Sequence, residues 1–534
     1  MQFFSKYAPY FYLILFGALG GLGFSPTYLV PLTLASYGGF YWVLNKYIMP
    51  GGTLKAAFSG WLYATLYFIS NLWWTGNALL VEDNPFIWAL PLAVIGFPAL
   101  LAGFISVICI IYNILLKKSP VKHSYMKYSL GNALVFAALL TSTEWMRGHM
   151  FTGFPWNLPG YVWSWNLEIL QILSVFGPYV LSFLTVLISP LFVNLVYNAK
   201  LKNNVLAACV IILVFLICGL WGSFRLGNNP TVYTSDVVRV IQPNIKQADK
   251  WDPAQYNTHL SLFSDMITES FKPDFRSARS VLFVTPETAL NETMLSSPEA
   301  PYKLQSIFET LQQLPFPAYL YTGYMRSEYN SAEPNKPLYF NSSMLLNDKG
   351  ENLAFFDKFH LVPFGEYMPY EDIVPIGPVV KFNGFQHGEG LRTLRAEGIP
   401  SFSPLICYEI LFPGEVFLAE DRPSVLVNIT NDAWYGLSPG PFQHALMANY
   451  RAIETGLPVI RSANTGMSVV TDAYGRTLSK TALNERINLD IFIPLSTYDP
   501  TIYSIWRDIP FYIMLLSALF VGLLLLFKSK NQNI

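Results

Sequence analysis

Charged residues are scarce in this sequence. Asp, Glu, Lys and Arg make up 13% of its 534 residues, compared with roughly 25% in a typical soluble domain. Hydrophobic residues make up 52%, which is too many for a disordered chain, and the net charge of −1 shows no basic excess of the kind that binds nucleic acids. We therefore exclude both classes and expect no nucleic-acid partner.

Motifs for metals and cofactors are also missing. The six histidines show no H-x-x-x-H spacing, and the four cysteines form no C-x-x-C pair. The sequence has no Gly-rich loop of the phosphate-binding type, so we expect neither a metal nor a cofactor. Cys109, Cys209 and Cys218 lie in long apolar stretches, where cysteine usually serves as small apolar filler, whereas Cys407 lies outside them.

The near-neutral net charge is the sum of three unlike segments. Residues 1–222 contain 10 basic and 4 acidic residues, residues 223–508 contain 22 basic and 31 acidic residues, and residues 509–534 contain two lysines and no acid. This division predicts a transmembrane domain at 1–222, an extramembrane domain at 223–508, and a last span with a tail at 509–534.

Apolar stretches in these segments are long enough to cross a bilayer, which takes about 20 residues. We expect eight spans, near residues 8–23, 28–45, 57–75, 88–116, 129–146, 168–197, 204–222 and 509–527. No small-residue cleavage site clearly follows the first stretch, so we expect a retained helix rather than a signal peptide.

Lysines mark one side of the predicted membrane domain. Eleven of them lie in the termini and alternate loops that would share one side, whereas the other short loops carry only Arg147. Because cytoplasmic loops retain positive charge, we expect both termini in the cytoplasm. The 223–508 domain would then lie outside, where a lone thiol such as Cys407 is a liability unless it is buried or used.

The 223–508 domain alternates strand-like and helix-like segments, which predicts an α/β sandwich. Apolar runs predict strands at 237–241, 281–284, 318–321, 342–346, 405–406, 425–429 and 459–460. Amphipathic stretches predict helices at 253–270, 302–314 and 441–456. Turn signals at 347–350 and 472–475 predict hairpins.

Three apolar runs in this domain end close to a titratable side chain. These side chains are Glu287, Lys358 and Cys407, and strand ends are where the sites of α/β folds collect. The three groups suit acyl transfer. Cys407 would be the nucleophile, Glu287 the base that removes the thiol proton, and Lys358 the cation that stabilises an oxyanion.

The same three residues carry a family resemblance. With gaps of 71 and 49 residues, they resemble the Glu-Lys-Cys triad of the nitrilase (carbon-nitrogen hydrolase) superfamily. Longer motifs resemble the apolipoprotein N-acyltransferase family, and they lie at 144–147, 151–156, 250–252, 358–367, 406–410, 431–436 and 440–444. The resemblance covers nearly the whole chain, including eight spans with the catalytic domain between the seventh and the eighth.

The resemblance implies a polytopic α-helical membrane domain with an extracytoplasmic, nitrilase-like α/β/β/α sandwich. The protein would lie in the bacterial inner membrane with its catalytic domain in the periplasm. In a ping-pong reaction, Cys407 would take an acyl chain from a phospholipid, typically the sn-1 chain of phosphatidylethanolamine, as a thioester. The acceptor would be the N-terminal amine of a diacylated apolipoprotein. We expect a monomer with these two partners and the membrane.

The resemblance also implies roles for further residues. Glu366 would be a second carboxylate that orients Lys358 or supports the transition state. Supporting positions next to the nucleophile are Tyr408 and Glu409, and positions that match a substrate pocket or a mobile loop are Trp251, Asn341 and Trp434.

Two other functions remain open from the sequence. A membrane-tethered amide hydrolase would use the same triad and thioester, with water as the acceptor. A transporter or channel with a ligand-binding external domain is less well supported, because the spans carry few ionisable residues at depth. Glu144 is an acid placed at membrane depth, where it is either functional or paired with Arg147 one helical turn away.

Overall fold

The computed structural model describes residues 2–81, 84–118, 128–200, 202–271, 275, 277–329, 337–369 and 384–528. The chain forms two compact units. The helical unit comprises residues 1–76, 88–228 and 506–534, and the sandwich unit comprises residues 77–87 and 229–505. Residues 77–87 join the sandwich unit in part through Asn77, whose Nδ2 donates to the carbonyl oxygen of Tyr435 at 2.7 Å.

The helical unit is built from apolar helices. Its longer helices are α1 (Gln2–Leu19), α2 (Val30–Val43), α3 (Thr53–Leu72), α4 (Phe97–Lys118), α5 (Leu130–His149), α7 (Leu173–Asn198), α8 (Lys202–Asn228) and α14 (Ile509–Lys528). The expected span at 168–197 is divided, because short α6 (Leu167–Leu170) precedes α7 and Gly177, with φ 74°, interrupts α7 just before Pro178.

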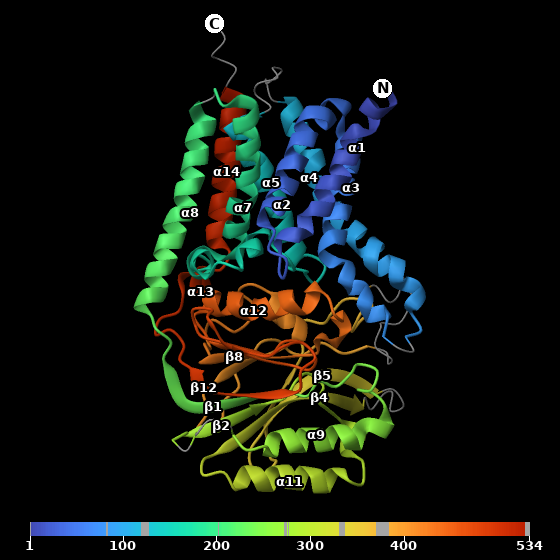
Figure 1. The fold of residues 1–534 in the computed structure, drawn as a ribbon, viewed down its shortest axis with the longest axis vertical. Coiled ribbons are helices and arrows are strands. Elements are labelled where there is room, and N and C mark those ends of the chain that lie inside the picture. Colours follow the sequence, from blue (N-terminus) through green and yellow to red (C-terminus); the bar gives the residue numbers. More distant parts are fainter. Residues whose placement is uncertain are drawn as a thin grey trace. The chain divides into compact units, whose positions relative to one another are not determined.

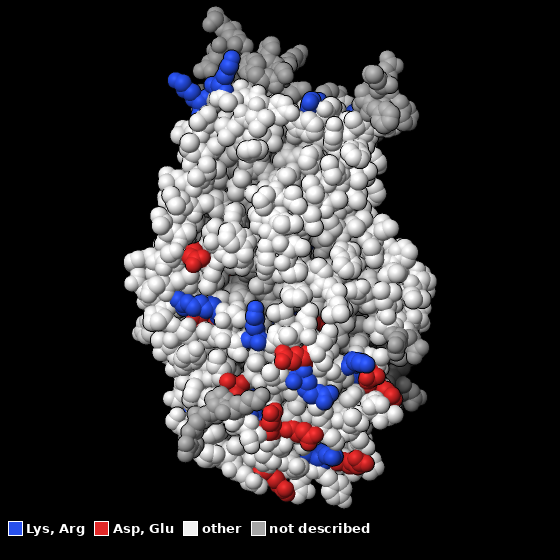
Figure 2. Space-filling view, in the orientation of Figure 1, with Lys and Arg blue, Asp and Glu red and all other residues white. Residues whose placement is uncertain are grey.

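Four stretches of the described residues are long and apolar enough to cross a membrane. They are Ile87–Lys118, Leu173–Asn198, Lys202–Asn228 and Ile509–Phe527. The other expected spans form α1, α2, α3 and α5, so the number of spans stays a prediction. Figure 2 shows a broad band of this unit without charged side chains, with Lys and Arg at the end where the termini lie.

The sandwich unit contains two β-sheets. Among the described residues, the larger sheet has the strand order β12-β1-β2-β4-β5-β6, with β3 beside β4, and the smaller has the order β11-β10-β9-β8-β7. The larger sheet is formed by β1 (Tyr233–Gln242), β2 (Ser280–Val284), β3 (Leu290–Asn291), β4 (Ala318–Tyr329), β5 (Pro337–Leu346), β6 (Asn352–Asp357) and β12 (Ile487–Pro494). The smaller is formed by β7 (Phe402–Ile406), β8 (Val425–Thr430), β9 (Val459–Ala463), β10 (Val469–Thr471) and β11 (Thr477–Lys480).

Helices cover the outer faces of both sheets. Figure 1 shows α9 (Tyr256–Thr268) and α11 (Ala300–Gln312) along the larger sheet and α12 (Pro439–Thr455) along the smaller. Two further short helices are α10 (Glu292–Leu295) and α13 (Ile502–Trp506). The order of layers in the sandwich unit is therefore α/β/β/α.

Strand β1 of the larger sheet is buried on both faces over most of its length. Val238 and Val240 pack in the core between the sheets, together with residues of β7 and β8. Val237 and Ile241 point to the other face and pack with residues of α9 and α11. Apolar residues on both faces of a strand thus hold two layers against it.

The predicted strands and turns are present in the structure, with shifted ends. The turn at 347–350 joins the antiparallel strands β5 and β6, and the turn at 472–475 joins β10 and β11, which confirms both hairpins. The sequence did not predict β12, which pairs with β1 at the edge of the larger sheet.

Candidate active site

The ends of three strands, of which β2 and β7 are fully buried, place the three candidate catalytic side chains. Glu287 lies three residues after β2, whereas Lys358 and Cys407 directly follow β6 and β7. Lys358 is 1% exposed, and Glu287 and Cys407 are each 6% exposed. A buried base, ammonium and thiol interact strongly, because little water screens their charges.

A network of short contacts holds the Glu287 carboxylate. Its Oε1 accepts a hydrogen bond from Asn341 Nδ2 at 2.7 Å, and its Oε2 accepts one from the backbone N–H of Asn431 at 2.8 Å. Lys358 Nζ lies 3.7 Å from the same Oε1. The carboxylate is therefore fixed by two donors and faces a cation.

Lys358 lies between two carboxylates. Its Nζ is 2.9 Å from Glu366 Oε1 and 2.8 Å from Glu366 Oε2, in addition to the longer contact with Glu287. Burial alone would lower the pKa of Lys358, but the charges of Glu366 and Glu287 outweigh burial and raise the pKa above its usual range. The ammonium therefore keeps its charge, as an oxyanion stabiliser must.

Asn341 joins the two carboxylates to each other. The same Nδ2 that contacts Glu287 also donates to Glu366 Oε1 at 2.9 Å. Glu366 is held further by the backbone N–H of Val362, which donates to its Oε2 at 2.8 Å. The structure thus brings Glu287, Asn341, Lys358 and Glu366 together as one network, which we call the carboxylate network.

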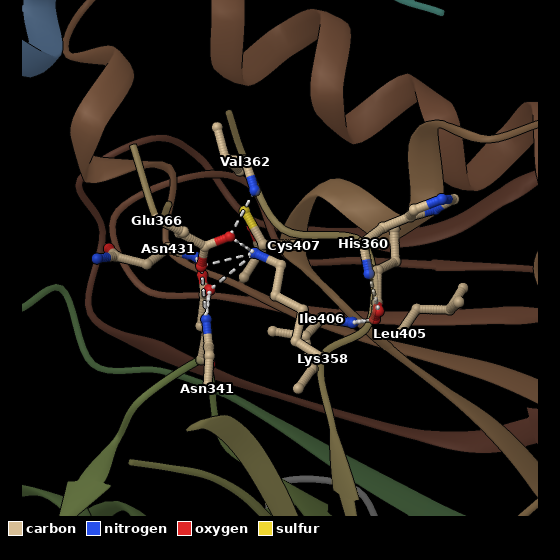
Figure 3. A network of polar contacts seen from close by, with 12 residues as sticks. Asn341, Lys358, His360, Val362, Glu366, Leu405, Ile406, Cys407 and Asn431 are labelled. Atoms are coloured by element: carbon tan, nitrogen blue, oxygen red, sulfur yellow. Dashed lines mark hydrogen bonds and ion pairs between the residues drawn. The ribbon is translucent and has the colours of Figure 1, made fainter. Parts of the chain in front are cut away.

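Cys407 stands on a sharp turn at the end of β7. Its φ is 52°, in the left-handed region that residues with a Cβ rarely adopt. Figure 3 shows its sulfur pointing into the same group of side chains as the Lys358 ammonium. Burial raises the pKa of the thiol, and Glu287 raises it further, whereas Lys358 lowers it. The resting thiol is therefore protonated, and it would need a base to become a nucleophile.

Glu409 ties the turn at Cys407 to the segment that follows Lys358. Its Oε2 accepts the backbone N–H of Ile406 at 2.6 Å, and its Oε1 accepts those of Phe359 and His360 at 2.8 and 3.2 Å. Burial raises the pKa of Glu409 to about 8, although these N–H groups act in the opposite direction. Glu409 thus joins the residue before Cys407 to the residues after Lys358.

The remaining predicted residues are close in sequence to residues of this site. Tyr408 is buried, and its ring packs edge-on against Phe412 with centroids 5.2 Å apart. Trp251 and Trp434 are half-buried, and Trp434 lies in the short 3-10 helix Asp432–Tyr435. A role for the two tryptophans in binding substrate stays a prediction.

Two residues that contact Glu287 were not predicted as site residues. Lys250 Nζ donates to the backbone carbonyl of Glu287 at 2.8 Å, and burial lowers the pKa of Lys250 to about 8. Asn431 contributes its backbone N–H to Glu287, as described above. Both residues lie in motifs that carry the family resemblance, but a backbone contact leaves no sequence signal of its own.

A cavity lies near Asn431, which contacts Glu287 but is not itself part of the carboxylate network. Gln247 Oε1 accepts a hydrogen bond from Asn431 Nδ2 at 2.7 Å, and Gln247 also lines a cavity of about 360 Å³. Among the described residues, no group of three or more His, Cys, Asp or Glu side chains could hold a metal ion.

Glu144 lies in the helical unit on α5. It is 3% exposed and forms an ion pair with Arg147 one turn further along the helix. Arg147 Nη2 also donates to the carbonyl oxygen of Trp156 at 2.9 Å. The pairing that the spacing allowed is therefore present, and it ties α5 to the segment that follows.

Two stacked sheets with a buried Glu, Lys and Cys after their strands are the arrangement of a carbon-nitrogen hydrolase, and the family model of that description matches residues 238–502. The model for the apolipoprotein N-acyltransferase N-terminal domain matches residues 16–191. The chain therefore belongs to the apolipoprotein N-acyltransferase family, as its motifs indicated.

Curated relatives match the chain over most of its length. It is 37% identical to the apolipoprotein N-acyltransferase of Brucella melitensis over 454 residues, which cover 84% of this chain and 81% of that protein. It is 33% identical to the apolipoprotein N-acyltransferase of Rickettsia prowazekii over 518 residues, which cover 96% of each chain. The match therefore includes both the helical unit and the sandwich unit.

Proposed function

We propose that this enzyme transfers the sn-1 acyl chain of a membrane phospholipid, typically phosphatidylethanolamine, to the N-terminal amine of diacylglyceryl-cysteine apolipoproteins. Family membership supports an acyltransferase of lipoprotein biosynthesis. The observation that carries the proposal is the buried carboxylate network, in which Lys358 contacts both Glu287 and Glu366. It provides a base and a fixed cation whose charges act on the Cys407 thiol.

In the first half-reaction, Cys407 attacks the ester carbonyl of the phospholipid. Glu287 takes the thiol proton as the sulfur–carbon bond forms, because the buried thiol does not ionise on its own. The ester carbon–oxygen bond then breaks, and the proton returns from Glu287 to the leaving oxygen. The products are a thioester on Cys407 and a lysophospholipid.

Lys358 is assigned to the tetrahedral intermediate. The negative charge that develops on the ester carbonyl oxygen needs a donor that is already in place, since reorganisation during the reaction would cost free energy. Glu366 holds the Lys358 ammonium at 2.8 and 2.9 Å. We assign Glu366 to positioning this ammonium.

In the second half-reaction, the amine of the apolipoprotein attacks the thioester. Glu287 accepts a proton from the amine as the carbon–nitrogen bond forms, and the carbon–sulfur bond breaks. The Cys407 thiol regains its proton, so the enzyme returns to its starting state. Because one thiol serves both substrates in turn, the kinetics are ping-pong.

The proposed topology has eight spans, cytoplasmic termini and a periplasmic catalytic domain. The lysine distribution supports it. So does the helical unit, in which α1 begins and α14 ends at one end, whereas α8 ends and α14 begins at the opposite end (Figure 1). The chain thus leaves and re-enters this unit on the side away from its termini. We propose a monomer.

An acceptor assay tests the proposed function. The purified full-length protein is incubated in detergent with phosphatidylethanolamine that carries an isotopically labelled sn-1 chain and with a diacylated lipopeptide. We expect the labelled chain on the lipopeptide amine and an equal amount of lysophospholipid. Labelled free fatty acid with an unmodified lipopeptide would instead show a hydrolase. Cys407→Ser and an sn-2-labelled lipid are the matched controls.

Thiol labelling in intact spheroplasts tests the topology. Single cysteines replace Lys118 at the end of α4 and Tyr302, which is 75% exposed, in a background in which Cys109, Cys209, Cys218 and Cys407 are replaced. An impermeant thiol reagent is expected to label position 302 and to leave position 118 unmodified until the membrane is permeabilised. The reverse pattern would overturn the periplasmic placement.

A further inference from the structure

The backbone carbonyl of Cys407 lies in a closed ring of buried polar contacts. His444 Nε2 lies 3.2 Å from this oxygen, and His444 Nδ1 lies 2.8 Å from Asp432 Oδ1. Arg461 contacts Asp432 Oδ2 at 2.7 Å and Asn428 Oδ1 at 2.5 Å. Asn428 Nδ2 returns to the Cys407 carbonyl at 3.4 Å. We call these contacts the carbonyl ring.

The carbonyl ring draws on four separate elements. Asn428 lies on β8, Asp432 in the 3-10 helix after β8, His444 on α12, and Arg461 on β9. All four side chains are at most 1% exposed. Four buried polar groups from separate elements, of which His444 and Asn428 contact the Cys407 carbonyl, form a rigid arrangement, because an unsatisfied member would be costly.

This carbonyl belongs to the strained residue of the site. Cys407 has φ 52°, a conformation that costs free energy for a residue with a Cβ. The direction of its Cα–Cβ bond, and hence of the thiol, depends on the peptide plane that follows it. A carbonyl oxygen only accepts hydrogen bonds, so His444 Nε2 carries the proton in the contact.

We infer that His444 is a positioning residue, which holds the Cys407 carbonyl and thereby keeps the thiol directed at Glu287 and Lys358. Arg461 Nη2, which lies 3.1 Å from His444 Nδ1, orients the imidazole in turn, and Asp432 fixes that guanidinium. Asn428 supplies the second donor to the carbonyl. Without the contact from Nε2, the Cys407 peptide would be free to leave the left-handed region, and the thiol would turn away from the carboxylate network. This inference rests on the proposed role of Cys407 as the nucleophile.

Two substitutions of His444 separate positioning from general stability. In His444→Gln the amide nitrogen can take the place of Nε2, whereas in His444→Asn the shorter amide replaces only the Nδ1 side. His259→Asn is the matched control, since His259 is also buried (6% exposed) but lies on α9. The full-length variants are compared by kcat, by KM for the phospholipid, by thermal midpoint, and by the rate at which iodoacetamide alkylates Cys407.

For His444→Asn we expect kcat and the Cys407 alkylation rate to fall by about tenfold to a hundredfold, because small misplacements of a reacting group have effects of this size. KM is expected to change by less than about threefold. His444→Gln should recover most of the loss, and His259→Asn should behave as wild type. Unchanged kcat in His444→Asn, or equal losses in the Gln and Asn variants, would overturn the inference.

If His444→Asn does not fold, Asn428→Ser tests the inference instead. It removes the second donor to the Cys407 carbonyl, so a smaller loss in the same direction is expected, and unchanged kcat and alkylation would overturn the inference. The alkylation rate does not depend on any acyl substrate. The variants could therefore show slower alkylation of Cys407 even if the wild-type enzyme transferred no acyl chain. That result would refute the proposed function but support the positioning role of the carbonyl ring.

Discussion

Replacing Lys358 with Met should lower both stability and catalysis. The loss of stability comes from the buried carboxylates that lose their cation, and the loss of catalysis comes from the oxyanion that loses it. The Lys358 ammonium is 2.8 and 2.9 Å from the oxygens of Glu366 and 3.7 Å from Glu287. Met has a similar length and no charge, so Lys358→Met leaves two buried carboxylates joined only through Asn341. Removing one partner of a buried ion pair costs about 3–5 kcal/mol. Because two carboxylates lose the same cation, we expect the upper part of this range.

The catalytic loss should be separate from this loss of stability. A fixed cation at a developing oxyanion accelerates a reaction by at least about a hundredfold, which corresponds to roughly 3 kcal/mol. Lys358→Arg should not restore the rate, since a planar guanidinium does not fit a site built for a compact ammonium.

The double variant Lys358→Met with Glu366→Gln distinguishes the two effects. It has the same net charge at the site as the wild type, and the Gln oxygen can still accept hydrogen bonds. The thermal midpoint in detergent should therefore recover by at least half, whereas lysophospholipid release should stay at the level of the single variant. Recovery of activity in the double variant, or near-normal turnover in Lys358→Met or Lys358→Arg, would refute the assignment of Lys358 to the oxyanion.

Three further variants test other parts of the site. Glu287→Gln should slow lysophospholipid release in a single turnover by at least about a hundredfold, because an amide cannot accept the thiol proton; an unchanged rate would exclude Glu287 as the base. Glu409→Gln replaces one of the two carboxyl oxygens that accept backbone N–H groups with an NH2 donor, so stability should fall by about 1–3 kcal/mol, and an unchanged thermal midpoint would contradict the bridging role. Lys250 has a pKa of about 8 when folded and about 10.4 when unfolded, so the unfolded chain binds the additional proton between these values and wild-type stability rises with pH. We therefore subtract the wild-type thermal midpoint from that of Lys250→Met and expect this difference to fall as the pH is raised from 7 to 9.5. A difference that stays constant or rises would count against a lowered pKa of Lys250.

The sequence carried enough information to find the ends of the key strands. Glu287, Lys358 and Cys407 each follow an apolar run, and a titratable residue after a buried strand is a strong local signal. The turn residues at 347–350 and 472–475 predicted both hairpins for a similar reason, since turn chemistry acts over a few residues.

Contacts between distant segments could not be predicted in this way. Asn341 lies within β5, where a polar residue signals only an interruption of the apolar pattern, yet it bridges two carboxylates. Glu409 was expected to support the site, but its three backbone partners leave no pattern of their own. Strand β12 lies about 250 residues from its partner β1, and Asp490 on it pairs with Arg239 across that distance.

The boundaries of the membrane helices show a second limit. Hydropathy marks apolar stretches, but the position where a helix is interrupted depends on backbone conformation. The 168–197 stretch is continuous in hydropathy, whereas the positive φ of Gly177 next to Pro178 breaks the helix within it. Windowed hydropathy averages over such single residues.

The mass of the enzyme after exposure to the donor lipid alone tests the central claim most directly. The purified full-length protein is incubated with phosphatidylethanolamine without any lipopeptide, and the peptide that contains Cys407 is then analysed by mass spectrometry. We predict the added mass of one acyl chain on Cys407, its removal by neutral hydroxylamine as expected for a thioester, and release of one lysophospholipid per enzyme molecule. An unmodified Cys407 in an enzyme that still acylates the lipopeptide would contradict the account and favour direct transfer in a ternary complex.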